Sequence, residues 1–386
     1  MPSAGQEGNR GAALRELAAL FARLGTTAFG GPAAHVSMME EEVVGRRRWL
    51  SREQFLDMVG ATNLIPGPNS TELAIHIGYA RAGWKGLVVA GSCFILPAAA
   101  MTLAIAWAYV RFGALPQVSS FLYGVKPVIT VIVLLALWRL GRTALKSAAL
   151  AVVAAAAVVA SGLRAHELLV LFGGGLAAML AASWRTARRD LAAFLIASAG
   201  FPMAPAAVAG DAAAPFSLAA LFLFFLKVGS VLFGSGYVLL AFLRADLVER
   251  WHWLTNAQLL DAIAVGQFTP GPVFCTATFI GYLLGGTPGA ALATLGIFLP
   301  AFVFVALSGL VLPRLRRSPR AGAFLDGLNA ASLALMAVVT WELARTAVPD
   351  WRAALLAAAA ALGLRLRVNS AWLVLGGGLA GHFLAP

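Results

Sequence analysis

Two long stretches of this chain carry no charged residue, and they constrain its fold more than any other feature. Residues 86–110 and 287–313 each exceed the length of about 20 residues that a helix needs to cross the hydrocarbon core of a bilayer. The composition agrees, because 60% of the 386 residues are hydrophobic, only 12% are charged, and the mean hydropathy is +0.82. The sequence therefore predicts an all-α polytopic membrane protein.

Charge and cysteine usage narrow the functional classes. The net charge of +12 comes from basic residues in short segments between apolar stretches, which is typical of cytoplasmic membrane loops and not of a nucleic-acid interface. Residues 1–17 are too polar for a signal peptide, so the N-terminus is expected in the cytosol. Cys93 and Cys275 stand alone, and motifs for nucleotide binding, hydrolysis or metal coordination do not occur. We expect no cofactor, no metal and no enzymatic activity.

The sequence also contains an internal repeat. The Pro-Gly-Pro segment at residues 66–68 recurs at 270–272, a spacing of 204 residues, and after the loss of one residue later pairs are 203 apart. Glycine and proline dominate the matching positions, which chance does not explain. We predict two homologous repeats, residues 1–187 and 212–386, joined by a linker helix at 188–211 that crosses the membrane. Further pairs are Gly25/Gly229, Trp49/Trp253, Asp57/Asp261, Gly78/Gly281, Pro97/Pro300, Gly124/Gly327 and Trp138/Trp341.

Loop charges predict that the two repeats have inverted topology. Residues 81–85 contain two basic residues and their counterpart at 284–288 contains none. Conversely, residues 111–117 contain one basic residue and their counterpart at 314–320 contains four. Because basic loops favour the cytoplasmic side, equivalent loops are expected on opposite sides of the membrane, with the C-terminus outside.

The first Pro-Gly-Pro segment, at residues 66–68, interrupts a stretch in which an apolar helix would otherwise continue. Proline lacks an N–H group and glycine lacks a stabilising side chain, so a helix arriving from Arg52 must end here. Asn69, followed three residues later by Glu72, fits an N-cap and its capping-box partner, which predicts that a second half-helix begins at once. The segment is either a re-entrant hairpin or two crossings, and the sequence leaves both open.

The sequence FGGPAAH at residues 29–35 predicts a second kind of break. Its two glycines end one helix, the proline after them takes a favoured first-turn position in the next, and the counterpart in the second repeat is FGSGY at 233–237. Broken backbone is tolerated in a bilayer only where it lines a cavity or is buried in protein, so the four breaks are expected to meet near the midplane. The N–H groups at the starts of half-helices would then form an anion site, whereas the alternative is a bundle of merely kinked helices. His35 either donates to the anion or only packs.

Several ionisable residues lie within apolar sequence. Lys126 either contacts the anion or extends to the membrane interface. Arg23 and Lys227 are repeat equivalents that either lend positive charge to the anion or face lipid headgroups. Glu72 and His76 lie one helical turn apart and either pass a proton or act as a helix cap and a packed histidine.

These stretches together resemble the chromate ion transporter (CHR) family in its long, two-domain form, over nearly the whole chain. The resemblance implies an inner-membrane, multi-pass secondary transporter that exports chromate and confers chromate resistance. The segments that carry it are LGTTAFGGPAAH at 24–35, residues 46–86 from RRRWLSREQF to GYARAGWKG, GVKP at 124–127, FLKVGSVLFGSGY at 225–237 and LTNAQLLDAIAVGQFTPGPV at 254–273.

The breaks and the resemblance define the expected site. The second Pro-Gly-Pro is followed by neither the Asn nor the Glu of the first, so the more polar part of the site is expected in the first repeat. The residues expected to bind the substrate are Gly30, Gly31, Pro32, His35, Pro66, Gly67, Pro68, Asn69, Ser70, Thr71, Lys126, Gly234, Pro270, Gly271 and Pro272. Those expected to couple charge or protons are Arg23, Glu72, His76 and Lys227.

Other functions fit the same features. Sulfate has the charge and shape of chromate, so a sulfate or oxyanion exchanger is the nearest alternative, and a passive anion channel would use the same helix termini. A membrane enzyme acting on lipid would need an acid/base pair, for which only Glu72 and His76 are candidates. The expected partners are chromate, with sulfate as second candidate, and the lipid bilayer; a homodimer is left open.

Overall fold

The structure is a computed structural model, and within its described residues every regular element is a helix, which confirms the predicted all-α class. Among the described helices, four are long and apolar enough to cross a membrane, namely α4, α5, α12 and α13. The predicted linker helix at 188–211, like Gly30 and Gly234 of the predicted site, lies outside the described residues. The described residues are 4–29, 31–113, 115–163, 165–184, 215–233, 239–316, 318–366 and 368–385.

The helices fall into two sets that follow the sequence repeat. Even unusual backbone recurs, because Arg48 and His252, one repeat apart, both have positive φ, at 52° and 54°, and each follows a π-helical segment. The first set is α1 (Ala4–Thr27), α2 (Gly31–Glu40), η1 (Glu41–Arg46), α3 (Arg52–Thr62), α4 (Asn69–Phe112), α5 (Pro116–Ala144), α6 (Ala148–Gly162) and α7 (Glu167–Trp184). The second is α9 (Leu218–Val231), α10 (Leu239–Phe242), η3 (Leu243–Arg250), α11 (Asn256–Phe268), η4 (Val273–Cys275), α12 (Thr276–Arg316), α13 (Pro319–Ala347), α14 (Trp351–Arg365) and α15 (Ser370–Leu384).

α4 reverses direction within its length. At Gly83 the backbone has φ 61° and ψ −146°, and the backbones of Gly78 and Gly86 on either side of it touch. In a continuous helix these two residues would be about 12 Å apart. α4 therefore consists of a half-helix, residues 69–81, and a longer span, residues 84–112.

α12 reverses in the same way one repeat later. Gly286 has φ 60° and ψ −153°, and the backbones of Gly281 and Gly289 touch as their counterparts do. The second half-helix is therefore residues 276–284, and the second long span is residues 287–316.

The half-helix 69–81 returns to the side from which α3 enters. Arg81, at its end, places its guanidinium group 5.0 Å from the ring centroid of Trp49, which comes just before Ser51, the N-cap of α3. α3 and the half-helix thus form a re-entrant hairpin, hairpin 1, whose tip is the Pro-Gly-Pro segment at 66–68. Of the two arrangements that the sequence left open, the structure has the re-entrant one.

α11 and residues 276–284 form the equivalent hairpin 2, with its tip at 270–272. Phe216 links its two ends, because its ring lies 5.2 Å from that of Trp253, just before α11, and a Cβ on Gly285 would lie 3.2 Å from it.

The two hairpins enter the protein from opposite ends. The span 84–112 starts at the open end of hairpin 1, and at Ala98 it meets the tip of hairpin 2, where a Cβ on Gly271 would lie 2.7 Å from the Ala98 Cβ. Near its far end, Tyr109 packs its ring 5.2 Å from that of Phe279, on an arm of hairpin 2. The open end of hairpin 1 therefore lies at the start of this span, whereas hairpin 2 opens toward the other end of the span, near Tyr109. This is the arrangement that inverted repeats require.

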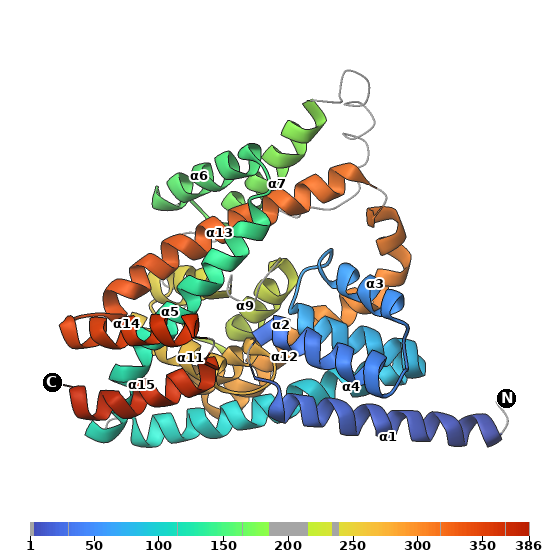
Figure 1. Cartoon of the computed structure of the whole chain (residues 1–386), viewed down its shortest axis with the longest axis horizontal. Coiled ribbons are helices and arrows are strands. Elements are labelled where there is room, and N and C mark those ends of the chain that lie inside the picture. The colour runs from blue at the N-terminus through green and yellow to red at the C-terminus, as the bar shows by residue number, and fades with distance from the viewer. Residues whose placement is uncertain are drawn as a thin grey trace.

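The remaining helices are exchanged between the repeats. α6 and α7 of the first repeat pack along α13 of the second, and α14 and α15 pack along α5 (Figure 1). Glycines permit these close approaches, since the backbone of Gly124 touches that of Gly381, and a Cβ on Gly327 would lie 2.5 Å from Ala178. Small residues let membrane helices associate through close packing, where the hydrophobic effect contributes little.

The re-entrant, inverted arrangement predicts which positions share a side of the membrane. In a cysteine-free background, E53C and K85C mark the two ends of hairpin 1, and A257C and T287C mark those of hairpin 2. We expect an impermeant maleimide to label the first pair from one side of oriented vesicles and the second pair from the other. Labelling of Glu53→Cys and Lys85→Cys from opposite sides would contradict the re-entrant hairpin.

Candidate functional site

The two Pro-Gly-Pro tips form equivalent hydrogen bonds with residues just before the predicted glycine breaks. The Gly67 N–H donates to the Leu232 carbonyl at 2.8 Å, and the Gly271 N–H donates to the Ala28 carbonyl at 2.9 Å. Both donors and both acceptors are one repeat apart in sequence, so the two bonds are equivalent. Each Pro-Gly-Pro tip is thereby joined to the other repeat just before its predicted glycine break, and the tips lie where the halves meet.

Both tips require glycine for steric reasons. Gly67 has φ 138° and Gly271 has φ 88°, backbone conformations that side chains disfavour. A Cβ on Gly67 would also collide with Oε1 of Glu72. The chain therefore turns at each tip in a way that only glycine permits, and the second arm begins at once with Asn69 in hairpin 1.

The predicted capping box at Asn69 is wrong. Pro68 occupies the N-cap position, where no side chain caps the helix, and the Asn69 side chain instead donates to Oδ1 of Asn63 at 2.8 Å. The N–H groups of Thr71 and Glu72 both reach the Pro68 carbonyl, at 2.8 and 3.0 Å. Since the first N–H groups of a helix have no acceptor within it, those of Asn69 and Ser70 point beyond its end.

Three predicted site residues are buried and carry polar atoms that have no hydrogen-bond partner among the described residues. Thr71 and Glu72, at the start of the half-helix, are fully buried, and the atoms in question are the Thr71 hydroxyl and both Glu72 carboxyl oxygens. His35 lies beside Ala28, with Nε2 3.1 Å from the Ala28 carbonyl and its ring edge-on against Phe94, and its Nδ1 is the third such group. His76 lies one turn beyond Glu72 and is partly buried.

Lys126 forms an ion pair between the two repeats. Its Nζ lies 3.2 Å from Oδ1 of Asp261 on α11, and the Tyr109 hydroxyl donates to Oδ2 of the same carboxylate at 2.9 Å. The Asp261 side chain is only 5% exposed. Lys126 is therefore held by a buried carboxylate of the other repeat. Sequence reasoning missed Asp261 as a site residue, although its place in an apolar segment just before Pro-Gly-Pro was a signal.

Arg23 and Lys227 are both held by acidic residues. Arg23 pairs with Glu42 at 2.7 Å, and Lys227 pairs with Asp246 one repeat later. Burial alone would raise the pKa of Glu42, but the guanidinium groups of Arg23 and Arg47 outweigh it and hold that pKa below its ordinary value. In each repeat the pair therefore links the first helix, α1 or α9, to the π-helical segment, η1 or η3, that follows it.

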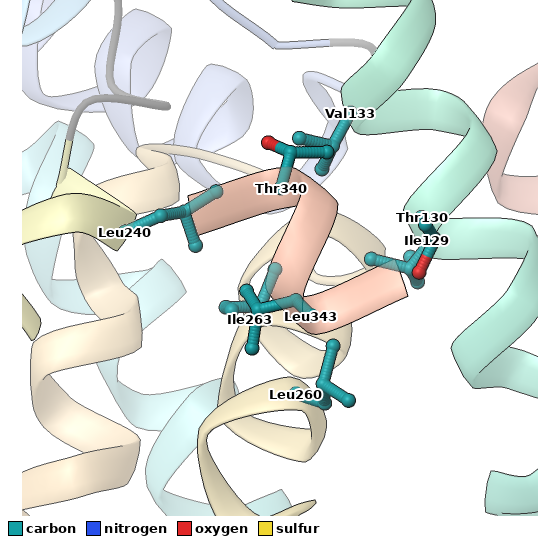
Figure 2. Close-up of a pocket in the computed structure, with 8 residues that line it drawn as sticks. All are labelled: Ile129, Thr130, Val133, Leu240, Leu260, Ile263, Thr340 and Leu343. Atoms are coloured by element: carbon teal, nitrogen blue, oxygen red, sulfur yellow. The ribbon is translucent and has the colours of Figure 1, made fainter. Parts of the chain in front are cut away.

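A small pocket lies between residues of α5 in the first repeat and of α10, α11 and α13 in the second (Figure 2). Its polar atoms belong to Thr130 and Thr340, whose hydroxyls donate to the carbonyls of Lys126 and Met336 on their own helices. The pocket presents no charged group and is therefore unsuited to an anion. The other lining residues are Ile129, Val133, Leu240, Leu260, Ile263 and Leu343.

Comparison with known proteins agrees with the repeat. The family model described as chromate transporter matches residues 15–180 and 219–382. The chain is 34% identical to a chromate transport protein of Cupriavidus metallidurans over 89% of this chain and 86% of that protein. It is 32% identical to a chromate transport protein of Pseudomonas aeruginosa over 96% and 92%, and 30% identical to a probable chromate transport protein of Synechococcus elongatus over 87% and 86%. No solved structure matches the chain.

Removing Lys126 is expected to destabilise the protein strongly. K126A leaves the Asp261 carboxylate buried without its cation, at a cost of about 3–5 kcal/mol. K146A is the matched control, because Lys146 pairs with Asp326 at an exposed site and such pairs contribute about 0–1 kcal/mol. Thermal denaturation in detergent measures both, and K126L combined with D261L should recover part of the loss. Equal losses of thermal stability in K126A and K146A would contradict the expected cost of leaving Asp261 without its cation.

Both tip glycines should resist substitution by alanine. G67A and G271A force a side chain into a disfavoured backbone conformation and into a neighbouring atom, so each is expected to cost about 1–3 kcal/mol. Gly173 on α7 has open space at its Cβ position, and G173A should be neutral or stabilising. The melting temperatures of the three variants, measured side by side, test the tip geometry; intact stability in G67A and G271A would contradict it.

Proposed function

The chain belongs to the chromate transporter family, and on that premise we propose that it is a secondary active transporter that exports chromate across the cell inner membrane and thereby confers chromate resistance. The observation that carries this proposal is the pair of equivalent hydrogen bonds that join each hairpin tip to the opposite repeat. They mark the place where both halves contribute backbone groups within the apolar part of the protein. A carrier needs its substrate site at such a place.

The oxyanion is recognised by backbone groups at the start of the half-helix 69–81. The N–H groups of Asn69 and Ser70 point beyond the helix end, where the helix dipole adds about half a positive charge. The buried Thr71 hydroxyl offers a further donor. Hairpin 2 does not offer the same hydroxyl donor, because the hydroxyl of Thr276, at the start of α12, already donates to the Val273 carbonyl. The first repeat therefore supplies most of the contacts to the anion.

Transport requires the halves to move against each other at the tips. With the Gly67 N–H bonded to Leu232, hairpin 1 is closed against the second repeat. Separation of this pair frees the Gly67 N–H as a donor for the oxyanion. Separation of the equivalent pair at the other tip frees the Gly271 N–H from the Ala28 carbonyl in the same way. Alternate opening of the two pairs exposes the site to one side at a time.

The membrane potential favours export of a dianion. Moving one elementary charge across 100 mV is worth about 2.3 kcal/mol, so a dianion leaving an inside-negative cell gains about twice that amount. No nucleotide-binding motif occurs in the sequence, so transport draws on this potential or on an ion gradient.

Uptake of labelled chromate into everted membrane vesicles tests the function directly. The expected result is accumulation above equilibrium that stops when the potential and the pH gradient are both collapsed. Accumulation of sulfate in preference to chromate would favour a sulfate or oxyanion exchanger. Flux that never exceeds equilibrium would favour a passive channel and overturn the proposal.

Substitutions at the tip of hairpin 1 test the proposed site. P66A, G67A and N69A are each expected to abolish chromate exclusion from cells, because they alter the turn or the start of the half-helix that faces the anion. N369A is the matched control, because Asn369 caps α15, which belongs to neither hairpin, and the substitution should leave chromate exclusion intact. Immunoblots of membranes verify that the variants are present. Full chromate resistance in all three tip variants would rule out this site.

A further inference from the structure

One carboxyl group lies at the tip of hairpin 1 without a partner among the residues that the structure describes. Glu72 is fully buried, and neither of its carboxyl oxygens has a hydrogen-bond partner within those residues. Its Oε1 lies against Gly67, so closely that a Cβ there would collide with it. The carboxyl group therefore sits beside the start of the half-helix 69–81, next to the bond that joins Gly67 to Leu232.

Several charged groups of the surrounding elements form ion pairs with residues other than Glu72. On α1, Arg23 pairs with Glu42 and Glu16 with Arg81, and on α11 the Asp261 carboxylate pairs with Lys126. α12 carries no charged residue between Thr276 and Pro313. Within the described part of the chain, none of these groups forms an ion pair or hydrogen bond with Glu72. Arg52 on α3 pairs with Glu40 on α2. The other titratable residues on these elements include Glu53 and Asp57 on α3, His35 on α2, Arg15 on α1 and, on α4 itself, His76, Lys85 and Arg111.

The lack of a partner determines the charge of Glu72 in this conformation. An ionised carboxylate buried without a partner costs many kcal/mol, whereas a neutral carboxyl group costs far less. Glu72 is therefore protonated while the tips are closed. When the tips separate, water reaches the group and it can release or take up a proton.

We propose that Glu72 carries a proton that is transported together with the oxyanion, an inference that rests on the proposed function. A carboxylate beside the start of the half-helix would repel a dianion bound there, and a neutral carboxyl group would not. Oxyanion and proton therefore bind with positive coupling, each favouring the other. The proton enters from water on the side where the oxyanion binds and leaves to water on the side where it is released.

The two repeats provide one such group, not two. Counting back from the matching turn glycines, Gly83 and Gly286, the counterpart of Glu72 is Cys275, which is buried and uncharged. One proton per oxyanion follows. A dianion accompanied by one proton still carries a net negative charge, so an inside-negative potential still drives its export.

Proton movement in proteoliposomes tests this role. The purified full-length protein is reconstituted with a pH dye in the lumen, the potential is clamped with valinomycin and potassium, and an inward chromate gradient is applied. The wild type should acidify the lumen as chromate enters. E72Q, a permanently neutral mimic, should still exchange labelled for unlabelled chromate, while its chromate-driven acidification falls at least about tenfold.

Two further variants complete the test. E53Q removes an exposed carboxyl group on the other arm of the same hairpin and should behave as the wild type. E72D keeps a titratable group at the site and should retain acidification, which separates loss of the proton site from loss of the fold. Wild-type chromate entry without acidification, or acidification in E72Q equal to that of the wild type, overturns the inference. Absence of any chromate uptake or exchange by the wild type overturns the proposed function instead.

Discussion

A backbone N–H group that leaves a helix inside a bilayer must find its acceptor within the protein, and this requirement shapes the centre of the molecule. Each tip amide, at Gly67 and Gly271, is satisfied by a carbonyl of the opposite repeat, at Leu232 and Ala28. An unsatisfied group there would cost several kcal/mol. Neither repeat supplies both partners of either bond, so the broken helices are stable only when the two halves are assembled. The two halves are held together by the packing of α6 and α7 on α13 and of α14 and α15 on α5.

The backbone follows the pseudo-twofold symmetry, whereas the polar side chains follow it only in part. Arg23 with Glu42 and Lys227 with Asp246 are present in both repeats, as expected for contacts that stabilise the fold. Lys126 has Asn329 as its counterpart, and Glu72 has an uncharged one. The two repeats therefore share a backbone arrangement, but only the first carries Lys126 and Glu72. A single substrate site needs these ionisable groups only once.

The sequence predicted those features that depend on local backbone chemistry. Glycine and proline act on their own turn of chain, so the repeat, the apolar spans and the breaks at residues 66–68 and 270–272 could all be located in advance. The sequence did not decide whether each broken segment is a re-entrant hairpin or crosses the membrane twice, because the turn at Gly83 resembles any short basic loop. The capping box failed because Asn63, across the tip, competes for the Asn69 side chain. The pairing of Lys126 with Asp261 joins distant segments and leaves no local signal.

The Lys126–Asp261 pair also limits which movements are available to the hairpins. Asp261 lies on an arm of hairpin 2, Lys126 lies on α5, and the Tyr109 hydroxyl from the span 84–112 bonds the same carboxylate. Separating a buried ion pair without a substitute partner costs about 3–5 kcal/mol. A movement that opens the tips must therefore keep the arm of hairpin 2 against α5, or else bring an anion to Lys126 as Asp261 withdraws. In the second case the dianion itself supplies the missing charge, and opening without substrate is disfavoured by the energy of that pair.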